Sequence, residues 1–154
     1  MDSVVIGIDP GSKGAFCLLN PIKQIAVFKN TTDTPIDLYN WIKSVEKQYI
    51  IKVIMVENVH AIPGTSAGSN FKFGYNVGVV NTISQVTGNR VDLVNPKAWQ
   101  KFVGVTKKGK AIKKEVADIC QRLYPKVNIR GARGGLLDGL SDSLMIAHYA
   151  SLKY

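Results

Sequence analysis

The segment that most restricts the fold of this chain is an apolar run of eight residues, Ile50 to Glu57 (IIKVIMVE). The run is rich in β-branched residues and shows no alternation of polar and apolar positions, which is typical of a parallel strand buried on both faces. Its last residue is a carboxylate, which therefore lies at the carboxyl edge of the predicted sheet. A charged group that ends an apolar strand needs a partner or a function, because an isolated buried charge is costly.

Other segments complete an α/β pattern around this strand. Three apolar segments near the N-terminus are separated by turn residues and predict an antiparallel meander. Thr34 and Pro35 predict the start of a helix that ends near Gln48. The order of elements predicts one α/β domain, residues 1–154, with a mixed five-stranded sheet flanked by helices and an antiparallel arrangement of the first three strands. The predicted strands are Ser3 to Asp9, Gly14 to Leu19, Gln24 to Phe28, Ile50 to Glu57 and Arg90 to Val94, and the later helices are Phe71 to Val86, Pro96 to Val103, Lys110 to Tyr124 and Asp138 to Tyr154.

The positive charge is concentrated in one quarter of the chain. The 154 residues include 20 Lys and Arg against 11 Asp and Glu, which gives a net charge of +9. Between Lys97 and Arg133 there are eleven basic and two acidic residues, so this segment accounts for the whole excess. A solvated helix face is the plain alternative, but the confinement of the charge favours a polyanionic partner such as nucleic acid. An anionic membrane is a weaker explanation, because the charge is accompanied by no amphipathic anchor.

Four carboxylates lie at positions that the predicted topology brings together. Asp9 ends the first strand, Glu57 ends the fourth, and Asp138 and Asp142 lie one turn apart on the last helix. Taken singly, Asp9 fits an ordinary hairpin turn and Asp138 a favourable helix N-terminus. Together the acids would repel one another unless a cation neutralised them. Two hard divalent ions about 4 Å apart, bound by carboxylates, support phosphodiester hydrolysis, and Mg²⁺ is the expected ion.

Three short motifs contain these acids: Gly7 to Ser12 (GIDPGS), Val56 to Val59 (VENV) and Asp138 to Leu144 (DGLSDSL). They resemble the signatures of RuvC-type Holliday junction resolvases, a family with a ribonuclease H-like fold, and the compact lysine-rich chain favours a phage-type member. The resemblance spans most of the chain. Actin-like and sugar-kinase ATPases use a similar Asp-Gly hairpin, but those folds need two such domains, which 154 residues do not supply.

The resemblance implies catalytic and metal-binding roles for Asp9, Glu57, Asp138 and Asp142. It implies two Mg²⁺ ions per active site, with Mn²⁺ able to substitute. In bacterial members the first acid on the helix commonly lies three residues before the last. Here Gly139 holds that position and the acid is one step earlier, at Asp138.

The resemblance also implies DNA contacts and a dimer. The family places a residue that wedges against bases three positions after the strand acid, and in this chain it is His60 instead of the usual phenylalanine. A lone histidine more often has a structural role, although it can stack on a base. Family members are homodimers, and the helix after this loop lies in the interface, which would place Gly74 and Gly78 near the two-fold axis. The lysines expected to contact phosphates are Lys107, Lys108, Lys110, Lys113 and Lys114.

These features predict a metal-dependent, structure-selective endodeoxyribonuclease that cleaves Holliday junctions and related branched DNA by symmetric paired incisions in the cytoplasm. The expected partners are branched DNA and a second copy of the chain, with no membrane and no small-molecule substrate. One alternative is a ribonuclease H-like nuclease for RNA·DNA hybrids, forks or flaps, which would not need a dimer. Another is a catalytically silent module that binds branched DNA, which the retention of all four carboxylates argues against.

Overall fold

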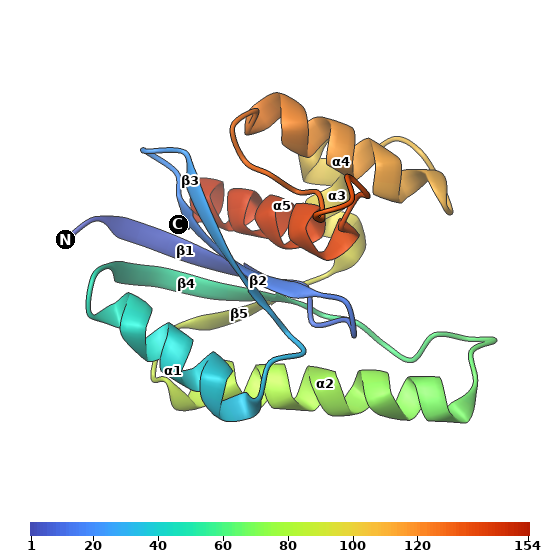
Figure 1. Cartoon of the computed structure of the whole chain (residues 1–154), viewed down its shortest axis with the longest axis horizontal. Helices are drawn as coiled ribbons and strands as arrows, with labels where there is room; N and C mark the ends of the chain where they lie inside the picture. The colour runs from blue at the N-terminus through green and yellow to red at the C-terminus, as the bar shows by residue number, and fades with distance from the viewer.

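A mixed five-stranded sheet in the order β3-β2-β1-β4-β5 forms the centre of the computed structural model, which describes residues 1–154 (Figure 1). β1 pairs antiparallel with β2, and β2 pairs antiparallel with β3, whereas β4 runs parallel to both β1 and β5. The predicted sheet with an antiparallel start is therefore confirmed. The strands are β1 (Ser3–Ile8), β2 (Ala15–Asn20), β3 (Ile25–Asn30), β4 (Ile50–Glu57) and β5 (Val91–Val94), and the helices are α1 (Pro35–Glu46), α2 (Ala67–Val86), α3 (Pro96–Val103), α4 (Ala111–Leu123) and α5 (Asp138–Lys153).

Helices cover both faces of the sheet (Figure 1). On one face α5 packs on β1 and β2, and α3 and α4 pack in turn against α5. On the other face α1 and α2 enclose a second apolar core. Successive residues of β4 point into opposite cores, with Val53 and Met55 toward α5 and Ile54 and Val56 toward α1 and α2. The apolar run of β4 is thus buried on both faces, as its sequence predicts.

Two glycines allow α5 to lie directly against the sheet. A Cβ atom added at Gly7 of β1 would come within 2.3 Å of the backbone nitrogen of Ala147 on α5. A Cβ atom added at Gly139 of α5 would come within 2.1 Å of the carbonyl oxygen of Lys13, in the turn between β1 and β2. These close contacts bring the acidic first turns of α5 to the carboxyl end of β1.

One helix begins earlier than predicted. The Gly/Ser/Pro-rich stretch 61–70 predicts a loop that ends at Phe71, but α2 begins at Ala67. The hydroxyl of Ser66 accepts a hydrogen bond from the backbone N–H of Ser69 (3.2 Å) and caps the helix. The loop before α2 is therefore shorter than the composition of the stretch suggests.

The basic segment 130–135, which its composition predicts to be a flexible loop, is a short hairpin. Arg130 pairs with Leu136 in an isolated antiparallel bridge. The N–H of Gly131 donates to the carbonyl of Gly135 (2.9 Å), and the guanidinium of Arg130 donates to the carbonyl of Gly134 (3.0 Å). These bonds give the segment a defined shape immediately before α5.

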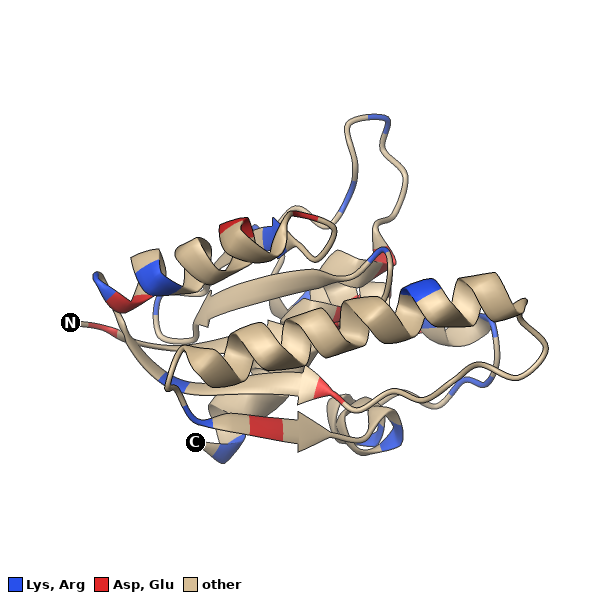
Figure 2. Ribbon diagram, turned by 90° about the horizontal axis from the view of Figure 1, so that it is seen from below, with Lys and Arg blue, Asp and Glu red and all other residues tan.

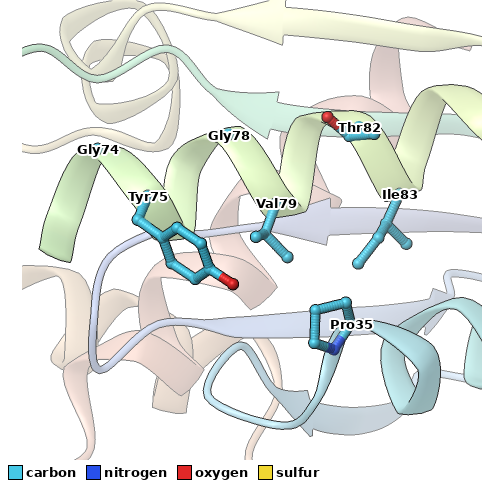
Figure 3. Close-up of a pocket in the computed structure, with 7 residues that line it drawn as sticks. All are labelled: Pro35, Gly74, Tyr75, Gly78, Val79, Thr82 and Ile83. Carbon is cyan, nitrogen blue, oxygen red and sulfur yellow. The ribbon is translucent and has the colours of Figure 1, made fainter.

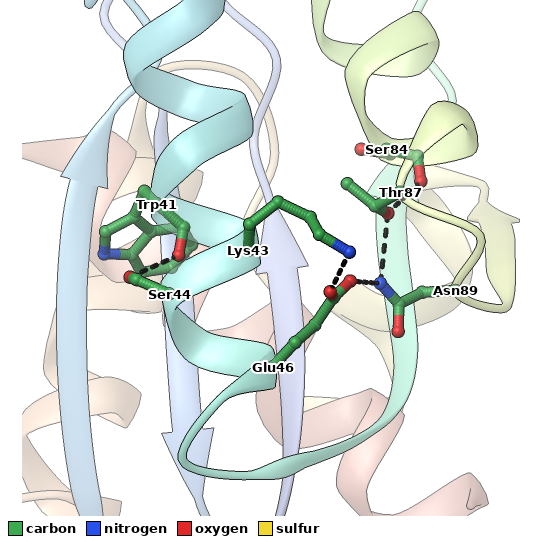
Figure 4. A network of polar contacts seen from close by, with 7 residues as sticks. All are labelled: Trp41, Lys43, Ser44, Glu46, Ser84, Thr87 and Asn89. Carbon is green, nitrogen blue, oxygen red and sulfur yellow. Dashed lines mark hydrogen bonds and ion pairs between the residues drawn. The ribbon is translucent and has the colours of Figure 1, made fainter.

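A polar network ties the end of α1 to the end of α2 at the amino ends of β4 and β5 (Figure 4). The amide of Asn89 donates to Oε1 of Glu46 (2.6 Å) and to the hydroxyl of Thr87 (3.0 Å). Lys43 pairs with the other oxygen of Glu46, and the Thr87 hydroxyl donates to the carbonyl of Ser84 (2.7 Å). The network fixes the amino ends of β4 and β5, at the opposite end of the strands from Asp9 and Glu57.

The longest helix, α2, carries almost no charge. Lys72 is its single charged residue, so the helix is nearly uniform in colour in Figure 2. Phe71 and Tyr75 are 77% and 64% exposed on its surface. Neither α2 nor any other helix combines the length and the apolar character of a membrane span.

Candidate active site

Asp9 lies directly after β1 in a turn that is anchored on two sides. Its Oδ1 accepts a hydrogen bond from the backbone N–H of Gly11 (3.0 Å). From α2, the side-chain amide of Asn76 donates to the carbonyls of Pro10 (2.6 Å) and Gly11 (2.9 Å). Burial raises the pKa of Asp9 above its ordinary range, and the nearby Asp138 adds to this effect. Asp9 is therefore held in place while its charge stays only partly compensated.

Glu57 ends β4, and a tryptophan orients its carboxylate. Oε2 of Glu57 accepts a hydrogen bond from the indole Nε1 of Trp99 at 2.5 Å. Trp99 lies on α3 and is 1% exposed, so the indole has little freedom to turn away. Burial raises the pKa of Glu57 to about 7, the charge of Asp9 adds to this, and the Trp99 hydrogen bond opposes it.

Asp138 and Asp142 occupy the first two turns of α5 and have different surroundings. Oδ2 of Asp138 is 2.5 Å from Nζ of Lys113, which projects from α4. Asp142 is half-buried and forms no hydrogen bond or ion pair with the protein. Burial raises the pKa of Asp142 well above its ordinary range, and Asp9, Glu57 and Asp138 add to this. The structure thus brings all four predicted acids within electrostatic reach of one another.

The four acids carry carboxylate oxygens, which are the ligands that a hard divalent cation prefers. Their side chains do not, however, lie in positions from which they could coordinate one ion together. No three Asp, Glu, His or Cys side chains stand close enough to hold an ion as they are. Trp99 binds one oxygen of Glu57, and Lys113 binds one oxygen of Asp138. Lys113 is also the one positively charged residue that lowers the raised pKa values of Asp9 and Asp142. The acids therefore have an unmet need for positive charge, which a cation coordinated by oxygen atoms would satisfy.

Among the five predicted phosphate-binding lysines, only Lys113 touches a carboxylate. The other four are exposed and form no ion pair. Lys107 and Lys114 border a separate surface hollow of about 390 Å³ together with Glu115. The basic segment therefore has one lysine at the acids, three exposed lysines in the loop before α4 and a further exposed lysine on α4 itself.

A cavity of about 410 Å³ opens beside Asp9 and Glu57. His60 is exposed and lies in the wall of this cavity, together with Phe73 of α2 and Lys97 of α3. The structure therefore places His60, which the motif spacing singles out, next to two of the four acids.

Two residues of the site, Trp99 and Asn76, escape prediction from the sequence. Each of them bonds to an element that is remote in the chain, Trp99 to the end of β4 and Asn76 to the turn after β1. Asn76 offers a weak signal, because it is a lone amide within the apolar, glycine-rich stretch 71–80. Trp99 offers none, since a tryptophan in a short helix is most simply a core residue.

The strand order, the two helical layers and the acids at the carboxyl edge define a ribonuclease H-like fold, as predicted. RuvC of Thermus thermophilus in complex with a Holliday junction substrate shares it, with 19% identity over 97% of this chain and 96% of that one and a TM-score of 0.64. Another Thermus thermophilus RuvC structure has 18% identity, the same coverage and a TM-score of 0.57. The yeast mitochondrial Holliday junction resolvase has 15% identity over 95% of this chain and 76% of its own, with a TM-score of 0.54. No protein-family model and no curated protein sequence matches the chain, so the similarity is one of fold.

Proposed function

We propose that this chain is a metal-dependent, structure-selective endodeoxyribonuclease that cleaves Holliday junctions and related branched DNA by symmetric paired incisions. The observation that carries the proposal is the meeting of four acids from β1, β4 and α5 at one sheet edge, with Asp142 left without a partner. The fold shared with two resolvases supports a nuclease. The basic segment supports a nucleic acid substrate, because Lys and Arg gain affinity from counterion release.

Asp9, Glu57, Asp138 and Asp142 would hold two Mg²⁺ ions, or Mn²⁺ in their place. Carboxylate oxygens are the ligands that both ions prefer. When bound, the ions neutralise the acids and supply Lewis-acid stabilisation of the charge that develops on the phosphodiester.

The residues around the acids prepare the site for this chemistry. The backbone N–H of Gly11 orients the carboxylate of Asp9, and the indole of Trp99 orients that of Glu57. Two of the acids are therefore held before any cation binds. Lys113, whose ammonium lies beside Asp138, presents a positive charge to a phosphate at the site. Charge that is already in position stabilises a transition state without a cost of reorganisation.

His60 would contact bases at the branch point. The imidazole is exposed in the wall of the cavity that also borders Asp9 and Glu57. A flat ring at that place can stack on an unpaired base, which is a contact that tolerates any sequence. This role agrees with a substrate recognised by its branched shape.

Paired incisions require two sites, and we assign the dimer interface to α2. Figure 3 shows Tyr75 and Ile83 projecting from α2 on the side of Pro35, around an open groove of about 420 Å³. Apart from the adjoining residues and backbone of α2 itself, nothing lies within 4 Å of a Cβ built at Gly74 or Gly78, so the surface over both glycines is open. A helix with a single charged residue, exposed aromatic residues and small residues four apart can accept a second helix at close range.

The proposed activity is tested by Mg²⁺-dependent cleavage of a synthetic four-way junction beside duplex, flap and RNA·DNA hybrid substrates. We expect cleavage of the junction, and a loss of at least about a hundredfold in both Asp9→Asn and Asp142→Asn, because each variant removes a charge that neighbours the reacting phosphate. Preferred cleavage of hybrids or flaps would favour the other nuclease, and binding without cleavage would favour the silent module. Undiminished cleavage by both variants would contradict the assigned site.

A further inference from the structure

The lysine loop, which we define as residues 104–110 between α3 and α4, is held by one side chain of α4. Oε2 of Glu115 accepts the backbone N–H groups of Thr106 (3.0 Å) and Lys107 (2.7 Å). Oε1 of Glu115 accepts the hydroxyl of Thr106 (2.7 Å). These bonds, that of Lys107 foremost, hold the pKa of Glu115 below its ordinary value. One carboxylate thus fixes two consecutive residues of the loop.

Little else fixes the middle of the lysine loop. Residues 106–110 are exposed, and no side chain caps the start of α4. The other backbone hydrogen bonds of the loop lie at its ends, where Gly104 donates to Lys101 (3.2 Å), Val105 donates to Gln100 (2.9 Å) and Ile112 donates to Gly109 (3.2 Å). Without the Glu115 carboxylate, the central part of the loop would have only these bonds at its ends to order it.

The lysine loop and the side chain of Lys113 lie on different sides of α4. Lys113 and Glu115 are two residues apart, which separates their directions by about 200° around a helix. Lys113 turns toward Asp138, whereas Glu115 binds the loop and borders the surface hollow with Lys107 and Lys114. A phosphate bound by the loop is therefore a different one from the phosphate beside Lys113.

We propose that Glu115 is a positioning residue for DNA binding, and that the lysine loop which it orders is a second phosphate-contacting surface beside the carboxylate site. This inference rests on the proposed function. A loop that is ordered in advance loses less conformational entropy when it binds, so its lysines contribute more net affinity. Glu115 therefore strengthens the attraction to a polyanion, whereas its negative charge alone would weaken it.

The test uses a matched pair of variants, Glu115→Gln and Asp118→Asn, each of which removes one negative charge from α4. Asp118 is exposed and forms no hydrogen bond, so its replacement changes the charge alone. Junction affinity is measured by fluorescence anisotropy in EDTA at several salt concentrations. We expect Glu115→Gln to weaken binding about three- to tenfold because a neutral amide with one acceptor oxygen orders the loop less firmly than the carboxylate, and the salt slope to fall by about 1 for each lysine that no longer reaches a phosphate. Asp118→Asn should bind as tightly as the wild type or more tightly.

Hydrogen exchange at the backbone amides of Thr106 and Lys107 in the free protein measures the strength of their hydrogen bonds to Glu115 without DNA. We expect faster exchange in Glu115→Gln, the same variant as in the affinity measurement, and a smaller change in the same direction in Thr106→Val, which loses only the hydroxyl bond and serves if the Glu115 variant does not fold. Faster exchange with unchanged junction affinity would overturn the inference, as would tighter binding by Glu115→Gln. A wild-type chain without affinity for the junction would instead contradict the proposed function.

Discussion

At the scale of single residues, Asp142 has the surroundings least suited to a charged side chain. It is half-buried, it has no hydrogen-bond partner, and three other acids add to the effect of burial on its pKa. Residues at functional sites are often unfavourable for the stability of the protein that carries them. The metal-free protein therefore bears a cost at Asp142 that a bound cation would remove.

Asp142→Asn is expected to stabilise the metal-free protein and to abolish cleavage. An amide of the same shape replaces a half-buried carboxyl group that has no hydrogen-bond partner and whose ionisation is disfavoured, which corresponds to about 1–3 kcal/mol in the free energy of unfolding. Urea denaturation in EDTA at neutral pH measures the change, with the exposed Asp118→Asn as a control that should stay within about 0.5 kcal/mol of the wild type. A less stable Asp142→Asn protein would show that the charge is compensated in solution.

Lys113→Met is expected to reduce junction cleavage far more than Lys114→Met. Both variants remove one positive charge from the same turn of α4, but only Lys113 lies against an acid of the site. Loss of a stabilising group positioned at the reacting atoms lowers kcat by about 100- to 1000-fold, whereas a lysine that does not contact the site contributes chiefly to binding and its salt dependence. Single-turnover kinetics with saturating enzyme separate the two effects. Equal losses of rate in both variants would contradict a special role for Lys113.

At the scale of elements, the site depends on how closely α5 approaches β1. Gly7→Ala is expected to destabilise the fold by about 1–3 kcal/mol, because overpacked side chains force the backbone to move, and its Cβ would lie 2.3 Å from a backbone nitrogen of α5. Gly68→Ala in α2 is the control: no atom lies within 4 Å of its Cβ, and alanine favours a helix by up to about 1 kcal/mol. Thermal unfolding of both variants tests this, and a neutral Gly7→Ala would contradict the close approach of α5.

The α5 helix also contributes a pH dependence of stability through His148. Its Nδ1 is 2.8 Å from the hydroxyl of Tyr124, and burial lowers the pKa of His148 from the ordinary value of 6.5. Because the unfolded chain takes up the proton more readily, the free energy of unfolding is at its full value above pH 6.5 and falls as the pH drops toward the lowered pKa. His148→Asn should show a smaller loss between pH 7 and about pH 5 in urea denaturation. Identical slopes in the two proteins would contradict this assignment.

The elements that were predicted correctly carry their signals locally. β4 and α3 have the predicted bounds, because an uninterrupted apolar run marks the strand and an Asn-Pro pair marks the start of the helix. The proximity of Asp9 and Glu57 also follows from the sequence, since the parallel strands β1 and β4 end at the same side of the sheet. The contacts of Trp99 and Asn76 could not be predicted, because they depend on which remote elements become neighbours. The early start of α2 was missed because one capping serine is hidden among other small polar residues.

At the scale of the whole molecule, the proposed function requires two copies of the site. The groove along α2 is mainly apolar, and it shares no lining residue with the cavity beside Asp9 and Glu57. The excess positive charge between Lys97 and Arg133 lies outside α2, so the helix proposed for the interface carries none of it.

Gly78→Glu is expected to convert the proposed dimer to a monomer. The position is open in a helix, so the side chain can be accommodated in the single chain, but a charge without a partner inside an apolar interface is strongly unfavourable. Sedimentation velocity measures the mass, with Gln48→Glu as a control that adds the same charge at an exposed position outside α2. An unchanged mass in Gly78→Glu would place the interface elsewhere or exclude it.

The most direct test of the proposed function is to map the incisions on a synthetic four-way junction, with each strand labelled in turn and Mg²⁺ present. The proposed dimer with one acidic site per chain predicts one incision on each of two opposing strands, at symmetry-related positions, and none in Asp9→Asn or Asp142→Asn. Incision of a single strand, incisions at unrelated positions, or equal cutting of plain duplex would contradict it.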